Sequence, residues 1–146
     1  MSSKLRWFYS RAFYAARSCY RFCSRAFYDA LSCYGRLRSI NYDMGNTIVI
    51  AGSPRSGTTW LSEILHTIPR SCILHEPINP NSVSEVNALE LGWRPYITPE
   101  ADWPEVQEFM MRVLTGQVLN SHTVRRARPA EILRNEHWII KFVRAD

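Results

Sequence analysis

The stretch TIVIAGSPRSGTTW, residues 47–60, decides the fold predicted for this chain. Its apolar run, Ile48 to Ala51, has the β-branched composition of a strand that is covered on both faces. Gly52 and Gly57 bracket a turn that needs unusual backbone angles or close approach to a ligand. Thr58 then opens an amphipathic segment whose unpaired N–H groups and dipole point back at the turn. A strand, a glycine turn and a helix start together predict an anion site in an α/β domain.

The side chains in the turn indicate which anion fits. The spacing of Gly52 and Gly57 matches the nucleotide-triphosphate loop G-x-x-x-x-G-K-[ST], but Thr58 stands where that loop has its lysine. Arg55 is the cation of the turn, three residues after the first glycine. A displaced cation favours a phosphate ester over a metal-bound triphosphate. The alternative interpretation is a helix cap in an ordinary α/β domain.

The segment Pro-Arg-Ser-Gly-Thr-Thr at residues 54–59 resembles the 5′-phosphosulfate-binding loop of the PAPS-dependent sulfotransferases, in its carbohydrate-type and bacterial form. A second, weaker match is His75-Glu76-Pro77, which is similar to an acidic-proline motif of that group. The resemblance covers residues 46–80 well and residues 138–144 loosely. It implies a P-loop-type three-layer fold with a central parallel sheet. It also implies 3′-phosphoadenosine 5′-phosphosulfate (PAPS) as donor, without a metal. The residues expected to hold it are Ser53, Pro54, Arg55, Ser56, Gly57, Thr58, Thr59 and Trp60.

Sulfuryl transfer needs positioning and charge stabilisation more than covalent catalysis. Negative charge develops on the oxygen that leaves sulfur, and Arg55 is placed to neutralise it. An arginine stays protonated near neutral pH, so Arg55 is expected to bind and stabilise charge rather than act as an acid.

The acceptor must lose a proton, which requires a base. By the resemblance Glu76 is the expected base and His75 the reserve. Both follow the apolar run of residues 72–74, which predicts a parallel strand ending near the first. Because neighbouring strand residues point to opposite faces, at most one of the two is expected to face the donor. The alternative is that Glu76 caps a turn or pairs with an arginine.

The remaining sequence predicts scaffolding. Apolar residues recur at helical spacing over residues 106–114, up to Gly116, and residues 138–143 predict a further strand that contains Lys141. Whether Lys141 and Arg144, near the end of that strand, approach the site is not decided by the sequence. A basic cluster, Arg125, Arg126 and Arg128, either binds the donor's 3′-phosphate or an anionic glycan, or is a solvated surface.

The chain falls into two predicted parts, a basic aromatic arm over residues 1–41 and a sulfotransferase-like domain over residues 44–146. No downstream arginine-serine segment for the 3′-phosphate is recognisable, so we expect an incomplete sheet and the amino-terminal fragment of a longer enzyme. In the arm, residues 10–20 recur fourteen positions later at residues 24–34, which keeps helical faces aligned. The arm carries eight Lys/Arg and one acidic residue, +7, whereas the remainder carries ten and twelve, −2, giving the total of +5.

The aromatic, arginine-rich arm has two leading interpretations. It binds an anionic membrane surface, or it packs on the rest of the protein or stays disordered. Binding to nucleic acid ranks below both. The sequence lacks an apolar run of about 20 residues and a signal-peptide core, so we expect a cytoplasmic location and rank a transit peptide below it. Peripheral attachment to a membrane through the arm stays an open alternative. The cysteine spacing predicts reduced thiols and no metal site.

Two functions are therefore expected. The first is transfer of the sulfuryl group of PAPS to a hydroxyl- or amine-bearing acceptor, a glycan, lipid or small molecule. The second is a non-catalytic P-loop-like protein that acts through a membrane- or RNA-binding arm.

Overall fold

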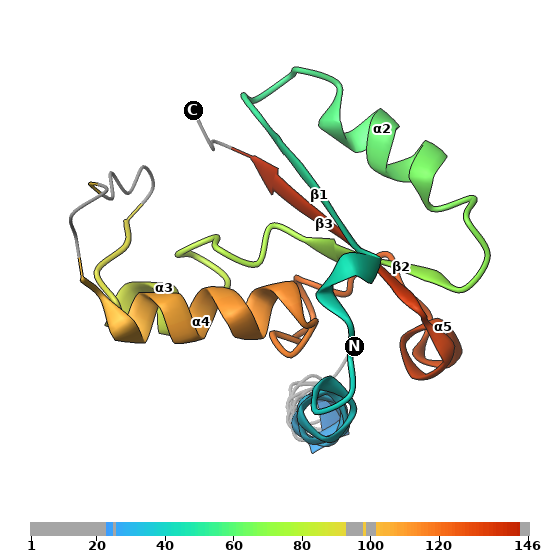
Figure 1. The fold of residues 1–146 in the computed structure, drawn as a ribbon, viewed down its shortest axis with the longest axis horizontal. Coiled ribbons are helices and arrows are strands. Elements are labelled where there is room, and N and C mark those ends of the chain that lie inside the picture. The colour runs from blue at the N-terminus through green and yellow to red at the C-terminus, as the bar shows by residue number, and fades with distance from the viewer. Residues whose placement is uncertain (1–22, 25, 93–97, 99–101, 144–146) are drawn as a thin grey trace, which may run out of the picture.

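The structure is a computed structural model that describes residues 23–24, 26–92, 98 and 102–143. The start of the arm, residues 1–22, and Arg144 lie outside the described residues. Among the helices of the described residues, none combines the length and the apolar character that crossing a bilayer requires. The architecture is mixed α/β, built on a small parallel sheet (Figure 1).

Three strands form the sheet: β1 (Thr47–Gly52), β2 (Ser71–His75) and β3 (His137–Val143). All pair in parallel, in the order β1-β3-β2. β3 takes the central position because its residues 138–142 are buried on both faces. The expected strands are confirmed, but the second does not lie beside the first. The connection from β1 to β2 skips one position in the sheet, and β3 fills that position. In dinucleotide-binding folds with strand order 3-2-1, by contrast, the first and second strands are neighbours.

Alternate residues of the strands pack into two separate apolar layers. On one face Ile50, Ile73 and Ile139 lie under α2 (Thr58–Leu65). On the other face Leu74 and Ile140 belong to a larger cluster with α4 (Pro104–Leu114) and α5 (Pro129–Arg134). Helices therefore lie on both faces of the sheet (Figure 1). The period of two along each strand explains why adjacent isoleucines of β3 enter different layers.

The helical stripe expected over residues 106–114 is the core face of α4. Val106, Phe109 and Val113 are buried, while Met110 and Leu114 are partly buried against the same cluster. Gly116 follows with φ +71°, and a Cβ there would lie 2.0 Å from the Trp138 ring. This glycine is required twice, by the backbone angle and by the indole that packs on it.

The short elements complete the chain. A 3₁₀ turn, η1 (Met44–Asn46), leads into β1, and α3 (Ser84–Ala88) follows β2 in a segment rich in proline and asparagine. Its one turn fits the turn-rich composition of that segment.

The described part of the arm packs on the domain. Residues 26–39 form a helix below the sheet, seen nearly end-on in Figure 1. Leu31 belongs to the larger core cluster, and Ser32 Oγ donates to the Leu119 carbonyl at 3.0 Å. Arg38 donates to the Asn135 side chain. Phe27 and Tyr34, which lie near Leu31 in the sequence, are exposed by about two fifths of their surface.

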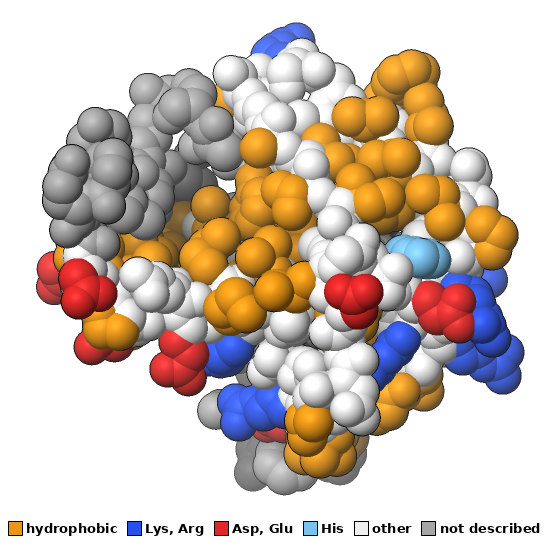
Figure 2. Space-filling view, viewed as in Figure 1, with side chains coloured by type: hydrophobic (Ala, Val, Ile, Leu, Met, Phe, Trp, Pro, Cys, Tyr) orange, Lys and Arg blue, Asp and Glu red, His pale blue; other side chains and the backbone are white. Residues whose placement is uncertain are grey.

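α2 presents most of its apolar side chains outward, whereas Leu65 packs on the sheet. Thr58 and Ser62 are buried against the sheet, whereas Trp60, Leu61 and Ile64 are 68%, 41% and 43% exposed. Ser62 avoids an unsatisfied hydroxyl because its Oγ donates to the Thr59 carbonyl at 2.7 Å. Figure 2 shows hydrophobic side chains gathered on this side of the molecule.

Candidate functional site

The turn between β1 and α2 is tight, and its backbone folds back on the end of β1. Arg55 and Gly57 both adopt left-handed angles, φ 68° and φ 81°. The Ser56 N–H donates to the Ser53 carbonyl at 3.2 Å, which closes the turn. A Cβ on Gly52 would lie 2.8 Å from Ser56 Oγ and 2.9 Å from Thr58 Cγ2. Gly52 is thus needed for the turn to fold back on the strand end.

The start of α2 is open to solvent and lacks a side-chain cap. Gly57 is its N-cap residue and offers no side chain to its first N–H groups. Residues 53–57 are all exposed. No described residue forms an ion pair or a side-chain hydrogen bond with Arg55. The turn therefore presents unpaired backbone donors and one unpaired guanidinium at the carboxyl end of β1.

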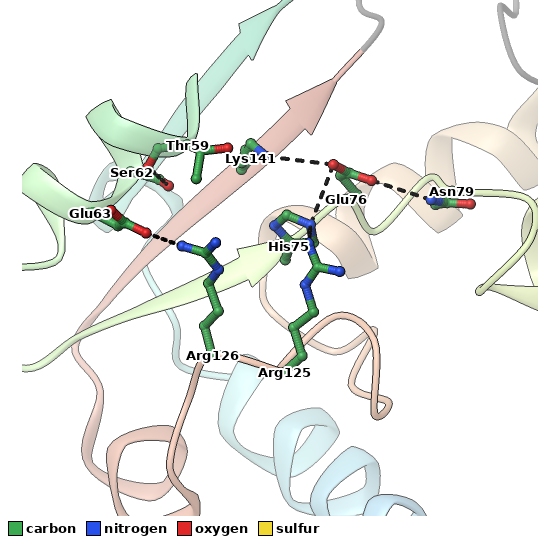
Figure 3. Close-up of polar contacts among 9 residues, drawn as sticks. All are labelled: Thr59, Ser62, Glu63, His75, Glu76, Asn79, Arg125, Arg126 and Lys141. Carbon is green, nitrogen blue, oxygen red and sulfur yellow. Dashed lines mark hydrogen bonds and ion pairs between the residues drawn. The ribbon is translucent and has the colours of Figure 1, made fainter. Parts of the chain in front are cut away.

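The second group of polar residues lies where β2 ends, at the same edge of the sheet. His75 pairs in register with Lys141, and the Glu76 N–H donates to the Lys141 carbonyl at 2.8 Å. Glu76 then turns the chain with φ 44°, a left-handed angle for a residue with a side chain. This angle breaks the alternation expected of a strand. As a result the side chains of His75 and Glu76 approach each other, with Nε2 and Oε1 3.3 Å apart (Figure 3). The prediction that they point to opposite faces is wrong for this reason.

Glu76 is held by three partners. Its Oε1 lies 3.5 Å from Lys141 Nζ and 3.3 Å from His75 Nε2, and its Oε2 accepts from Asn79 Nδ2 at 3.3 Å. Burial by itself raises the pKa of this carboxyl, but His75, the Asn79 hydrogen bond and Lys141 together hold the pKa below its usual value. Glu76 is therefore ionised at neutral pH. An ion pair at this position was the structural alternative for Glu76, and the partner is a lysine rather than an arginine.

His75 is a buried, neutral imidazole. Its side chain is 2% exposed, and burial lowers its pKa from 6.5 to about 4, against the opposing effect of Glu76. The Arg125 guanidinium contacts Nε2 (Figure 3). Nε2 can accept a hydrogen bond from Arg125 or donate one to Glu76, but not both at once. Because Arg125 contacts the nitrogen that faces Glu76, His75 is the poorer of the two base candidates.

His122 is a member of the group that the sequence did not indicate. Its ring lies 5.5 Å from the His75 ring, centroid to centroid, and its Nε2 is buried without a hydrogen-bond partner among the described residues. Burial, and then Arg125, lower the pKa of His122. A lone histidine in a polar loop gives no local signal, so only the fold places it here. Lys141 was singled out in the sequence as a lysine inside an apolar strand, but only the fold shows that it lies beside Glu76.

The three arginines of the basic cluster each have a different partner. Arg125 reaches His75, and Arg126 pairs with Glu63 on α2 (Figure 3). The Arg128 N–H donates to Glu131 Oε2 at the start of α5. All three arginines are exposed, as the interpretation as a solvated surface predicts, but Arg125 and Arg126 each also contact a side chain of another element. Arg125 has no carboxylate partner among the described residues.

A metal ligand set can be drawn from the same side chains. One ligand atom from each of His75, Glu76 and His122 lies within 4.8 Å of the others. Lys141 and Arg125 carry positive charge against two of these three groups, which opposes a cation. The arrangement suits an anion or a polar hydroxyl group better than a metal.

A shallow groove lies at the opposite edge of the sheet, between the helix over residues 26–39, η1 and His137 at the start of β3. None of the predicted site residues lines it. The comparisons with known proteins add no likeness: no protein-family model, no curated protein and no solved structure was found to match this chain.

Proposed function

We propose that this chain binds the 5′-phosphosulfate of PAPS in the β1–α2 turn and belongs to a sulfotransferase. The observation that carries the proposal is the exposed turn of residues 53–57 itself. It combines an unpaired Arg55, an uncapped helix start and a glycine that permits close backbone approach. The guanidinium and the free N–H groups of the helix start are the donors that an anionic ester requires, and the glycine lets the ester approach them. The loop has no lysine to bind a triphosphate.

The position of Glu76 supports a role on the acceptor side. Parallel strands bring their carboxyl ends to one edge, so the turn after β1 and the residue after β2 lie at the same edge, with β3 between them. In the proposed reaction the acceptor oxygen attacks sulfur and the bond from sulfur to the 5′-phosphate oxygen breaks. The acceptor proton passes to Glu76, and adenosine 3′,5′-bisphosphate leaves.

The contacts of Glu76 set a condition on this role. Both carboxylate oxygens are already occupied, by Lys141 and His75 on one side and by Asn79 on the other. An acceptor hydroxyl must therefore displace the 3.3 Å contact of Asn79 or of His75. His75, the Asn79 hydrogen bond and Lys141 hold the pKa of Glu76 below its usual value, so the carboxylate is ionised and ready to accept a proton. A depressed pKa also makes it a weak base, which fits a loose transition state with little early proton transfer.

Calorimetric titration with adenosine 3′,5′-bisphosphate tests the donor site, with ATP and magnesium as the competing nucleotide. Arg55→Ala should weaken bisphosphate binding about tenfold to a hundredfold, the worth of a hydrogen bond to a charged group. Arg70→Ala is the matched control. Arg70 is also an exposed arginine with a left-handed angle, φ 60°, but it precedes β2 at the opposite edge.

Binding that is equal in the wild type and in Arg55→Ala would remove the turn from the donor site. Tighter binding of ATP with magnesium than of the bisphosphate would point to phosphoryl transfer instead. A folded chain that binds neither nucleotide would refute the proposal for this chain.

A further inference from the structure

Lys141 is a buried lysine in the central strand of the sheet. Its side chain is 4% exposed, and its neighbours in β3, Ile140 and Phe142, are apolar. A lysine is almost never fully buried unless it is paired, because burial takes the ammonium out of water. This position in the fold therefore requires an anionic partner.

The partner that the described residues supply is a distant one. Glu76 Oε1 lies 3.5 Å from Lys141 Nζ, and the described residues give this ammonium no second carboxylate. Hydrogen bonds from a cation to a carboxylate are usually about 2.7–2.9 Å long. The same Glu76 oxygen also faces His75 Nε2, at 3.3 Å. An ammonium has three N–H donors, so its hydrogen-bonding capacity is largely unused here.

Lys141 projects from the face of the sheet that α2 covers. Side chains alternate along β3, and Ile139, two residues earlier, belongs to the apolar layer under α2. Ile50 of β1 belongs to the same layer and pairs in register with Lys141. β1 ends two residues later, at Gly52, which is about 7 Å further along the sheet. The flexible four-carbon side chain of a lysine bridges most of this gap to the donor turn.

The surroundings of Lys141 are rich in positive charge. Figure 3 shows Lys141 pointing towards Glu76, with Thr59, in the first turn of α2, on its other side in this view. Thr58 is buried, so the start of α2 packs on the sheet. A helix start carries partial positive charge, and Arg55 adds a full charge in the turn before it. Against these charges the carboxylate of Glu76 is incomplete compensation, which an anion bound in the turn would supply.

We infer, on the basis of the proposed function, that Lys141 is a second cation of the donor site and binds the 5′-phosphosulfate together with Arg55. The turn itself provides the guanidinium and the backbone N–H groups, and the neighbouring strand β3 provides the ammonium. In a buried site a compact charge of this kind stabilises the oxygen that leaves sulfur, where negative charge develops in the transition state.

The location of Lys141 also links the donor to the base. When the donor binds, the ammonium turns from Glu76 Oε1 towards the 5′-phosphosulfate. Glu76 then keeps its contacts with His75 and Asn79, which are the contacts that an acceptor hydroxyl displaces. A carboxylate that loses a cationic neighbour holds a proton more strongly. Glu76 is therefore a stronger base with the donor in place than without it.

Calorimetric titration with adenosine 3′,5′-bisphosphate tests this role on the double variant Lys141→Met/Glu76→Gln. The double variant removes both charges, so it leaves no unpaired charge buried in the sheet. If Lys141 took no part in binding, loss of the Glu76 charge would leave the affinity for an anion equal or higher. We expect the affinity to fall about tenfold, the effect of losing one hydrogen bond from a charged group.

The single variant Glu76→Gln should change the affinity in the opposite direction. It keeps the ammonium and frees it for the ligand, so the bisphosphate should bind more tightly than to the wild type. Arg112→Met/Glu85→Gln is the matched control. Arg112 of α4 and Glu85 of α3 form an ion pair of 2.9 Å on the other face of the sheet. This control should bind like the wild type, and circular dichroism should show that all variants are folded.

Arg55→Ala separates failure of this role from failure of the proposed function. Weaker binding in Arg55→Ala, with equal or tighter binding in Lys141→Met/Glu76→Gln, would overturn the role of Lys141 and leave the donor turn in place. Unchanged binding in Arg55→Ala would refute the turn as the donor site, and the role of Lys141 with it. An equal loss in Arg112→Met/Glu85→Gln would also overturn the role, because any neutralised ion pair would then have the same effect.

Discussion

Acidification is expected to destabilise this protein through His75. The folded state holds this imidazole neutral because it is buried, with a pKa of about 4 against 6.5 in the unfolded chain. Between these two values the unfolded state binds a proton that the folded state does not, so stability falls as the pH is lowered. When the pH falls from 7.5 to 5, the free energy of unfolding decreases only below the unfolded pKa of 6.5. That interval of about 1.5 pH units corresponds to about 2 kcal/mol. Below pH 4 both states are protonated and this loss levels off.

Urea unfolding at pH 7.5 and at pH 5, on wild type and His75→Gln, measures the effect. Glutamine does not titrate, and its amide can still accept from Arg125 where Nε2 did. The wild type should lose about 2 kcal/mol more than the variant between the two pH values. His122, whose pKa is also lowered, titrates in both proteins, so it largely cancels in the difference. Equal pH dependence of the two proteins would refute a neutral, desolvated His75.

Two further predictions concern stability near neutral pH. Glu76→Gln should cost about 2–3 kcal/mol in urea unfolding, because it leaves the buried Lys141 without its carboxylate; the partial exposure of Glu76 keeps the cost below that of a fully buried pair. The double variant Glu76→Gln/Lys141→Met should recover most of the loss, and strictly additive losses would contradict the pairing. Gly116→Ala should lower stability by about 3 kcal/mol or more, since the added Cβ meets Trp138 and the φ is positive. Gly92→Ala, with φ +56° and open space around it, should cost only about 1 kcal/mol in the same urea unfolding experiment, and equal losses would show that the Trp138 contact is unimportant.

Much of the fold follows from local pattern. The run of residues 48–51 is β-branched and apolar, and it forms β1; the apolar spacing of residues 106–114 forms α4. The coarse α/β class was predictable because alternating strand and helix periods are properties of neighbouring residues. The left-handed turn at Gly57 was also predictable, because glycine adopts that angle without strain.

The group around Glu76 was predictable only in part. Its own two members, His75 and Glu76, follow a strand and were expected at the sheet edge. Their convergence was not, because it depends on a single left-handed angle at Glu76 that a carboxylate residue rarely adopts. The Glu76 N–H must meet the Lys141 carbonyl for the chain to turn there, and the Lys141 partner is 65 residues away.

The sequence by itself determined the strands, the glycine turn, the helix that follows it and the spacing of the arm. Each depends on residues a few positions apart, whose periodicity is fixed by backbone geometry. Only the tertiary structure decided that β3 lies between β1 and β2, and that His122, Arg125 and Lys141 gather around the pair of His75 and Glu76. Those contacts join segments tens of residues apart, and they form because burying β3 on both faces leaves one place in the sheet for it.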